Sequence, residues 1–308
     1  MTGSEKLTGY QALRDRAAWM DLSGRGKIKL TGEDRARLLH AMTTNHIQQL
    51  TPGAGCYAFF LNDKGRILAD ANVLCRPEYF LLDVEPEVRE SLYRHLDHYI
   101  IADDVTLEDV TDVTATIAIE GPKASQVLQR AGAPVPEAEY GTVDWGQFTV
   151  ARLNATGSAG FFLFAPASEK AALLARLEAA GAEYADAEAA RVVRIEHGKP
   201  RYGEDISERF LAQEANQPHA LHFGKGCYLG QEIVERVRSR GQIHRVLMPL
   251  TLDAAEPPAP GTKLDNASEI TSAAYSPALG KVAALAYVRT DPGVQPVSVP
   301  AAEHLGNR

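Results

Sequence analysis

Cysteine is scarce in this sequence. Only three of its 308 residues are cysteine, at Cys56, Cys75 and Cys227, and no two of them form a CxxC pair. Three scattered thiols cannot supply a disulfide framework, a zinc knuckle or the four ligands of an iron–sulfur cluster. The scarcity favours a reducing compartment, although a single thiol can still be reactive.

Long apolar runs and a surplus of basic residues are also missing. No stretch of eighteen apolar residues occurs, and the first twenty residues lack the apolar segment of a signal peptide. Lys and Arg number 32 against 40 Asp and Glu, a net charge of −8, which is unlike proteins that bind nucleic acid through its phosphates. We therefore expect a cytoplasmic protein with no membrane segment and no direct nucleic-acid binding.

Familiar catalytic and metal motifs are absent as well. The sequence has no GxxxxGKS phosphate loop and no GxSxG nucleophile elbow. The histidine pairs His95/His98 and His219/His222 are too few to define a metal site, because such a site needs several converging ligands. We expect no bound metal.

The overall composition is that of a globular protein. Hydrophobic residues make up 45% and charged residues 23% of the chain. A chain of 308 residues is about twice the usual size of one domain, so we expect either two compact domains or one large domain.

Strand and helix patterns interleave along the first 240 residues. Residues 27–30 alternate like a strand, 56–84 read as an antiparallel meander with a turn at 62–65, and 186–197 reads as a helix that ends at Gly198. There is no strict βαβα rhythm, which favours an α+β fold.

The predicted secondary structure changes after Arg245. Short strand patterns, a Pro-rich link at 256–261 and no long helix follow. We predict a core over residues 1–240 and a small C-terminal β-barrel domain over residues 241–308.

Residue types that can carry chemistry are most concentrated between Phe223 and Arg245. The sequence of this segment is FGKGCYLGQEIVERVRSRGQIHR. Two glycines flank Cys227, and Lys225 and several arginines surround it in sequence. Nearby cations would lower the pKa of the thiol. The alternative is a buried cysteine in a loop before an amphipathic helix whose arginines are merely solvated.

KGCYLGQE closely resembles the signature K-G-C-[FY]-x-G-Q-E of the YgfZ family, relatives of the glycine cleavage T protein (aminomethyltransferase). The fixed positions are all matched, by Lys225, Gly226, Cys227, Tyr228, Gly230, Gln231 and Glu232.

Three other segments carry the same resemblance. Residues 194–206, RIEHGKPRYGEDI, look like a segment shared by both branches, and NDKGRILADANV resembles the T-protein hairpin that places an acid against folate. TSAAYSPALGKVAALAYVR is similar to the C-terminal barrel of that superfamily. The resemblance thus covers nearly the whole chain.

The resemblance implies an aminomethyltransferase-like core that binds tetrahydrofolate or a one-carbon derivative of it. It also implies a role in the assembly or repair of iron–sulfur enzymes, including enzymes that modify tRNA. The motif cysteine, Cys227, is functionally important in that family and is a candidate catalytic residue here.

Two carboxylates are the main candidate folate contacts. Glu196 could accept the adjacent N–H donors of a pterin, and Asp70 matches the T-protein aspartate near the reacting folate nitrogens. Their ordinary alternatives are a solvated helix glutamate and an acid on the solvent face of a hairpin.

Basic groups are expected near the carboxylates of the folate tail. Arg25, Arg191 and Arg201 are candidates, and we expect Tyr202 in the matched segment to be a further cofactor contact.

Three functions remain, and the first two are from different classes. The first is a tetrahydrofolate-binding accessory protein of the YgfZ type, whose partners are iron–sulfur enzymes or their assembly machinery. The second is an enzyme, a folate-dependent aminomethyltransferase or demethylase, in which Asp70 is catalytic. The motif at Lys225 to Glu232 supports the first, and Asp70 supports the second. A third option is a folate-type fold used only for protein interaction.

Overall fold

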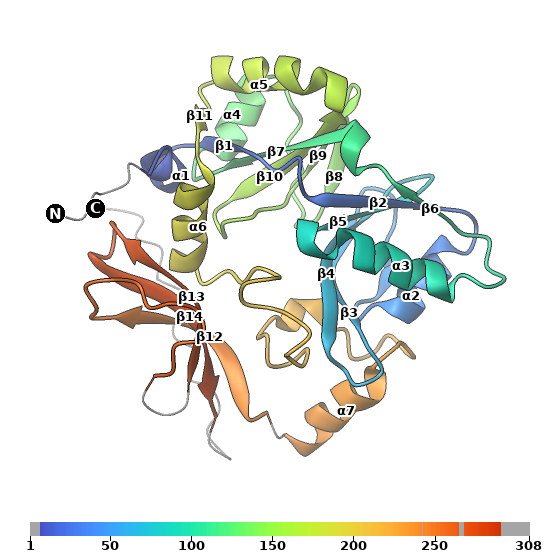
Figure 1. The fold of residues 1–308 in the computed structure, drawn as a ribbon. Coiled ribbons are helices and arrows are strands. Elements are labelled where there is room, and N and C mark those ends of the chain that lie inside the picture. Colours follow the sequence, from blue (N-terminus) through green and yellow to red (C-terminus); the bar gives the residue numbers. More distant parts are fainter. Residues whose placement is uncertain (1–6, 242, 265–267, 291–308) are drawn as a thin grey trace.

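The computed structural model describes residues 7–241, 243–264 and 268–290 and contains three β-sheets with helices packed around them (Figure 1). Across the six-stranded sheet lie β11 (Glu183–Tyr184), β1 (Ala18–Asp21), β7 (Thr114–Glu120), β10 (Gly160–Pro166), β9 (Phe148–Ala151) and β8 (Thr142–Trp145). Across the five-stranded sheet lie β3 (Gly55–Leu61), β4 (Ile67–Cys75), β5 (Phe80–Val84), β2 (Gly26–Thr31) and β6 (Thr106–Asp109). The fold is α+β, as expected.

Seven α-helices are present in the described part of the chain. They are α1 (Tyr10–Asp15), α2 (Arg35–Met42), α3 (Arg89–Tyr99), α4 (Ala124–Arg130), α5 (Lys170–Ala179), α6 (Ala187–Glu196) and α7 (Gln231–Arg240). The short 3-10 turns are η1 (Ile47–Gln49), η2 (Pro86–Val88), η3 (Thr111–Val113), η4 (Ala167–Glu169) and η5 (Pro218–Ala220). Figure 1 shows α4 and α5 over the six-stranded sheet and α2 and α3 beside the five-stranded sheet.

The expected meander over residues 56–84 is confirmed as β3, β4 and β5. The turn between β3 and β4 is closed by the Asn62 side chain, whose Oδ1 accepts the main-chain N–H of Lys64 at 2.9 Å. Gly65 has a φ of 69°, in the left-handed region that glycine adopts without steric cost. This local chemistry fixes the register that pairs Phe59 with Asp70.

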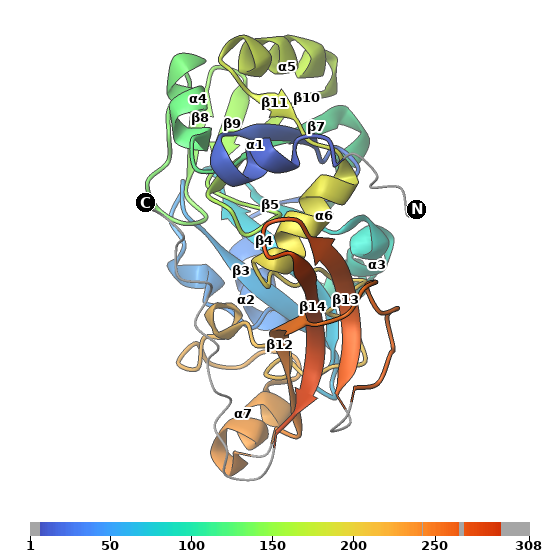
Figure 2. The ribbon, with the colours of Figure 1, turned by 90° about the vertical axis from the view of Figure 1, so that its left-hand side faces the viewer.

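Helix α6 joins the core to the C-terminal sheet. Asp186 caps its first turn by accepting the N–H of Ala189 at 2.7 Å. Buried Arg194 pairs with Asp205 at 2.5 Å, and Asp205 also accepts hydrogen bonds from Thr271 and Ser272. Figure 2 shows α6 between α1 and the strands of this last sheet.

The C-terminal strands form an open sheet in the described residues. β12 (Arg245–Leu252), β14 (Lys281–Arg289) and β13 (Glu269–Ser276) pair antiparallel in that order, without closing into the small barrel that the sequence predicts. The end of the predicted domain, from residue 291, lies outside the described residues. The boundary at 240/241 stays a prediction.

One apolar cluster connects all three sheets. It includes Leu81 from the five-stranded sheet, Phe162 from the six-stranded sheet, Val193 from α6 and Ala283 from the C-terminal sheet. Burial of the larger side chains among them, those of Leu81, Phe162 and Val193, contributes about 1.5–3 kcal/mol each. The cluster holds the sheets around the cavity described next.

Candidate functional site

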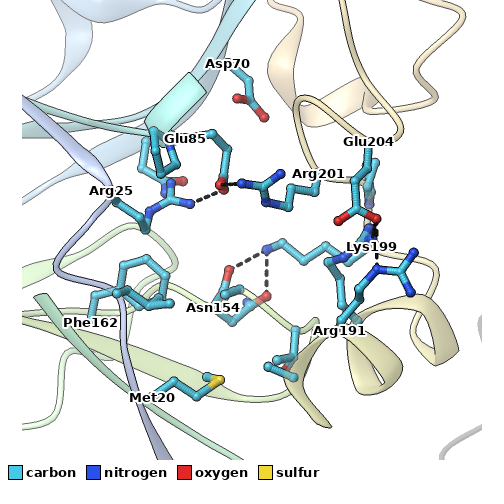
Figure 3. A pocket seen from close by; sticks show the side chains of 18 of the residues that line it. Met20, Arg25, Asp70, Glu85, Asn154, Phe162, Arg191, Lys199, Arg201 and Glu204 are labelled. Atoms are coloured by element: carbon cyan, nitrogen blue, oxygen red, sulfur yellow. Dashed lines mark hydrogen bonds and ion pairs between the residues drawn. The ribbon is translucent and has the colours of Figure 1, made fainter. Parts of the chain in front are cut away.

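A cavity of about 440 Å³ lies where the two larger sheets and α6 meet (Figure 3). Its wall includes Arg25 from the loop between β1 and β2, Tyr57 from β3, Asp70 from β4 and Asn154 after β9. Residues after α6, among them Lys199, complete the wall. The volume lies within the range of small-molecule sites, about 300–1,000 Å³.

Asp70 is the buried carboxyl group of this cavity. Only 8% of the residue is exposed, and its Oδ2 accepts a hydrogen bond from the Tyr57 hydroxyl at 2.7 Å. The Tyr57 ring stacks on His219, with ring centroids 5.3 Å apart. Burial raises the pKa of Asp70 to about 6, while the Tyr57 hydrogen bond and Arg25 act in the opposite direction. A carboxyl group in this state can hold or release a proton near neutral pH.

Arg25 and Arg201 line the cavity, but both are already ion-paired. Arg25 contacts Asp83 at 2.8 Å and Glu85, and Arg201 contacts Glu85 at 3.0 Å and Glu87 at 2.7 Å. Burial opposes the ionisation of Glu85, but the two arginines outweigh it and hold the pKa of Glu85 below its usual value. The result is the bridge Arg25–Glu85–Arg201 visible in Figure 3.

Arg191, the third candidate arginine, also lines the cavity. Its Nε lies 3.2 Å from Glu204, and its Nη1 donates to the main-chain oxygen of Ala273 at 3.1 Å. All three arginines predicted near a ligand therefore line the cavity, but each already forms an ion pair with a protein carboxylate.

Lys199 also lines the cavity and was not predicted from the sequence. Its Nζ donates to the main-chain oxygen and to Oδ1 of Asn154, at 2.6 and 2.7 Å. Burial lowers the pKa of Lys199, and Glu120 partly offsets this. No ion pair to Lys199 occurs within the described residues. A lone lysine after a helix is usually solvated, so the only sequence signal was its place in the matched 194–206 segment.

The expectation that Glu196 faces the cavity is wrong. Its carboxylate is bound by the hydroxyls of Tyr10 and Ser276 and by Arg14, each at 2.5 Å, between α1, α6 and the end of β13. Arg194 lines the cavity and lies two residues earlier on α6. Two helical residues point roughly 200° apart, so Glu196 faces away.

Tyr202 does not line the cavity either. It is buried in the apolar core of the five-stranded sheet, and its hydroxyl donates to the main-chain oxygen of Ile67 at 3.3 Å. We do not retain Tyr202 as a ligand contact, because its ring and its hydroxyl both have partners within the protein.

The KGCYLGQE residues form a loop and the start of α7, away from the cavity wall. Cys227 is exposed, as expected, whereas Cys75 is buried and Cys56 half-buried. Gly230 has a φ of 85°, and a Cβ there would lie 2.6 Å from the Asn62 oxygen. Gln231 begins α7 and Glu232 lies in its first turn, where a negative charge favours the helix. Cys227 and Asp70, both predicted to be catalytic, are thus not brought together.

Lys225 anchors this loop to the end of α2. Its Nζ donates to the main-chain oxygens of His40 and, at 2.5 Å, of Thr43, and it lies over the Tyr228 ring at 4.5 Å. The main-chain N–H of Leu229 donates to Ala41 at 3.0 Å. These contacts give Lys225 a structural role in holding the loop.

Three imidazole rings pack beside the loop anchor. The ring centroids of His40 and His46 are 4.7 Å apart, and those of His46 and His222 are 5.1 Å apart. Nε2 of His40 lies 2.9 Å from the Lys225 carbonyl oxygen, an acceptor, so we assign the proton to Nε2. No cluster of His, Cys, Asp or Glu in the described ranges is arranged to hold a metal ion.

No helix in the described part of the chain is long and apolar enough to cross a membrane.

Comparison with known proteins identifies the family. The family model described as GCVT N-terminal domain matches residues 7–225. An aminomethyltransferase of Rubrobacter xylanophilus is 32% identical over 292 residues, covering 91% of this chain and 78% of that protein. An aminomethyltransferase of Streptomyces coelicolor is 30% identical over 321 residues, covering 96% and 85%.

A solved structure confirms the expected aminomethyltransferase-like fold. The glycine cleavage system aminomethyltransferase T from Bartonella henselae superposes with a TM-score of 0.84 at 20% identity, covering 92% of this chain and 81% of that one. The fold and the sequence matches agree, and this chain belongs to the GCVT N-terminal domain family.

Proposed function

We propose that the protein binds a reduced folate in the central cavity and acts as an accessory protein of the YgfZ type that supports iron–sulfur enzymes, including enzymes that modify tRNA. The main support for folate binding is the buried Asp70 carboxyl group, which faces a cavity of about 440 Å³. Asp70 forms no ion pair with any described residue.

The residues in the cavity suit a pterin chemically. A pterin offers N–H donors, which the Asp70 carboxylate can accept, and the flat Tyr57 ring lies beside that carboxylate. Apolar wall residues such as Met20 and Phe162 provide contact for an aromatic ring. When bound, tetrahydrofolate supplies nitrogen atoms that carry a one-carbon unit. The described residues would bind and orient it.

The accessory role rests on the motif loop. Cys227 is exposed and is not part of the cavity wall, so a ligand in the cavity leaves the thiol accessible to a protein partner. The anchor from Lys225 to α2 fixes the loop that carries this thiol. An exposed thiol on a fixed loop suits contact with another protein, such as an iron–sulfur enzyme or its assembly machinery.

One observation favours the second function, one-carbon transfer. Asp70 has a pKa near 6 and faces the cavity, so it can stabilise positive charge that develops on a substrate, or take up a proton. This function needs no thiol, and measurable transfer from an aminomethyl donor that vanishes in Asp70→Asn would favour it.

Calorimetric titration with tetrahydrofolate tests the binding part. Asp70→Asn should bind about ten- to a hundredfold more weakly than the wild type, because it loses a charged hydrogen-bond acceptor. Asp63→Asn, in the exposed turn between β3 and β4, is the control and should bind normally. Equal affinity in Asp70→Asn and wild type would contradict the proposed site.

Complementation tests the accessory part. Cells that carry only Cys227→Ala should lose iron–sulfur enzyme activity and grow poorly under oxidative stress, while Cys56→Ala, outside the motif, serves as the control. The purified Cys227→Ala protein should still fold and bind folate, because truncation of an exposed side chain costs under about 1 kcal/mol. Full complementation by Cys227→Ala would refute the accessory role.

A further inference from the structure

The cations that line the cavity differ in how their charge is balanced. Each of the four arginines, Arg25, Arg191, Arg194 and Arg201, lies within 3.2 Å of a protein carboxylate. Their charges are therefore neutralised within the wall. An arginine in such a pair is a poor candidate for binding a ligand anion, because the ligand would have to displace the carboxylate.

Lys199 is the exception. Its Nζ contacts only two neutral oxygens, both of Asn154, and among the residues that the structure describes it has no carboxylate within ion-pair distance. An ammonium group carries three donors, so one N–H remains for another partner. In Figure 3 the side chain extends across the cavity toward Asn154, below the Arg25–Glu85–Arg201 bridge.

A partly buried cation without an ion-pair partner is costly, even when neutral oxygens accept its hydrogen bonds. Burial lowers the pKa of Lys199, and Arg25 adds to the effect, whereas Glu120, Asp70 and Glu85 oppose it from beyond contact distance. A protein that used this residue only for stability would lose little by replacing it with an apolar one. The unbalanced charge therefore points to a ligand anion.

We infer that Lys199 is the residue that binds the anionic group of the cavity's ligand, and that this group is a carboxylate. The inference rests on the folate-binding function proposed above and makes it more specific. Asp70 and Lys199 are two charged wall residues of opposite sign without an ion-pair partner in the described ranges. Together they select a reduced pterin that carries N–H donors at one end and a carboxylate tail at the other.

The test compares two ligands in calorimetric titrations. Tetrahydrofolate has the carboxylate tail, and 6-methyltetrahydropterin has the reduced pterin but no carboxylate. Lys199→Met should weaken tetrahydrofolate binding about ten- to a hundredfold and leave the affinity for 6-methyltetrahydropterin unchanged. Lys199→Arg, which keeps the charge, should restore part of the loss. Lys123→Met removes an exposed lysine outside the cavity and is the matched control.

A thermal melt without ligand distinguishes a ligand-binding role of Lys199 from a structural one. If Lys199 stabilised the fold, Lys199→Met would melt at a lower temperature than the wild type. Lys199→Met should melt at the wild-type temperature or higher, because it removes an unbalanced charge from the protein. If Lys199→Met does not fold, Lys199→Gln gives the same ligand comparison.

The outcomes separate this inference from the proposed function. Wild-type protein that binds neither ligand contradicts folate binding and the role of Lys199 together. Wild-type protein that binds tetrahydrofolate, with a Lys199→Met variant that binds it equally well, overturns the inference and leaves folate binding standing. Equal losses for both ligands also overturn it, because Lys199 would then act on the pterin or on the shape of the cavity.

Discussion

The hydroxyl of Tyr57 lies 2.7 Å from Oδ2 of Asp70 and donates a hydrogen bond to it. The two residues are thirteen positions apart on neighbouring antiparallel strands, β3 and β4. Because the strand register fixes both side chains on one face, the sheet itself orients the Asp70 carboxylate toward the cavity.

Asp70→Asn should stabilise the protein at neutral pH. The folded pKa of Asp70, about 6, exceeds the unfolded value near 4, so the wild-type residue favours folding below about pH 4 and loses this contribution as the pH rises through 6. The uncharged variant should gain about 1–3 kcal/mol near neutral pH, and the gain should shrink toward about pH 4. Urea denaturation at several pH values measures it; a gain that grows on acidification would contradict the prediction.

Tyr57→Phe should raise the pKa of Asp70 above about 6. The phenylalanine keeps the ring but removes the hydroxyl, which stabilises the ionised carboxylate by donating to it. Carboxyl titration by NMR in both proteins measures the shift. A lower pKa in the variant would show that the hydroxyl does not donate to the carboxylate.

Glu196→Ala should destabilise the fold and spare ligand binding. The side chain of Glu196 is 2% exposed and bound by Tyr10, Arg14 and Ser276, so its removal should cost about 3 kcal/mol, the lower end of the range for a broken buried pair because Arg14 is partly exposed. Chemical denaturation measures the cost. The folded variant should bind tetrahydrofolate normally, and a large loss of affinity would return Glu196 to the site.

Much of the fold was predictable from the sequence because it depends on local patterns. The turn at Asn62 and Gly65 and the capped helix after Asp186 carry their own signals in the chain. The open C-terminal sheet of the described residues was not predictable in the same way, because closure into a barrel depends on pairing between distant strands rather than on the strand pattern.

The site was predictable only in part. Asp70 was found through a hairpin resemblance, and its orientation follows from the strand period. Glu196 was misplaced although helix periodicity already separates it from Arg191 and Arg194, which line the cavity. Lys199 was missed because its environment depends on Asn154, which is distant in sequence.

Cys227 should be the fastest of the three cysteines to be alkylated. It is exposed, whereas burial raises the pKa of Cys56 to about 12 and also raises the pKa of Cys75. Mass spectrometry after brief iodoacetamide treatment at neutral pH should find most label on Cys227. Earlier labelling of Cys56 or Cys75 would mean that the motif loop is covered in solution.

A crystal structure of the protein soaked with tetrahydrofolate tests the central claim most directly. The account predicts ligand density in the cavity between the two large sheets and α6, with pterin nitrogens within hydrogen-bond distance of Asp70 and a carboxylate at Lys199. Density at another place, or an empty cavity at a saturating concentration, would contradict it.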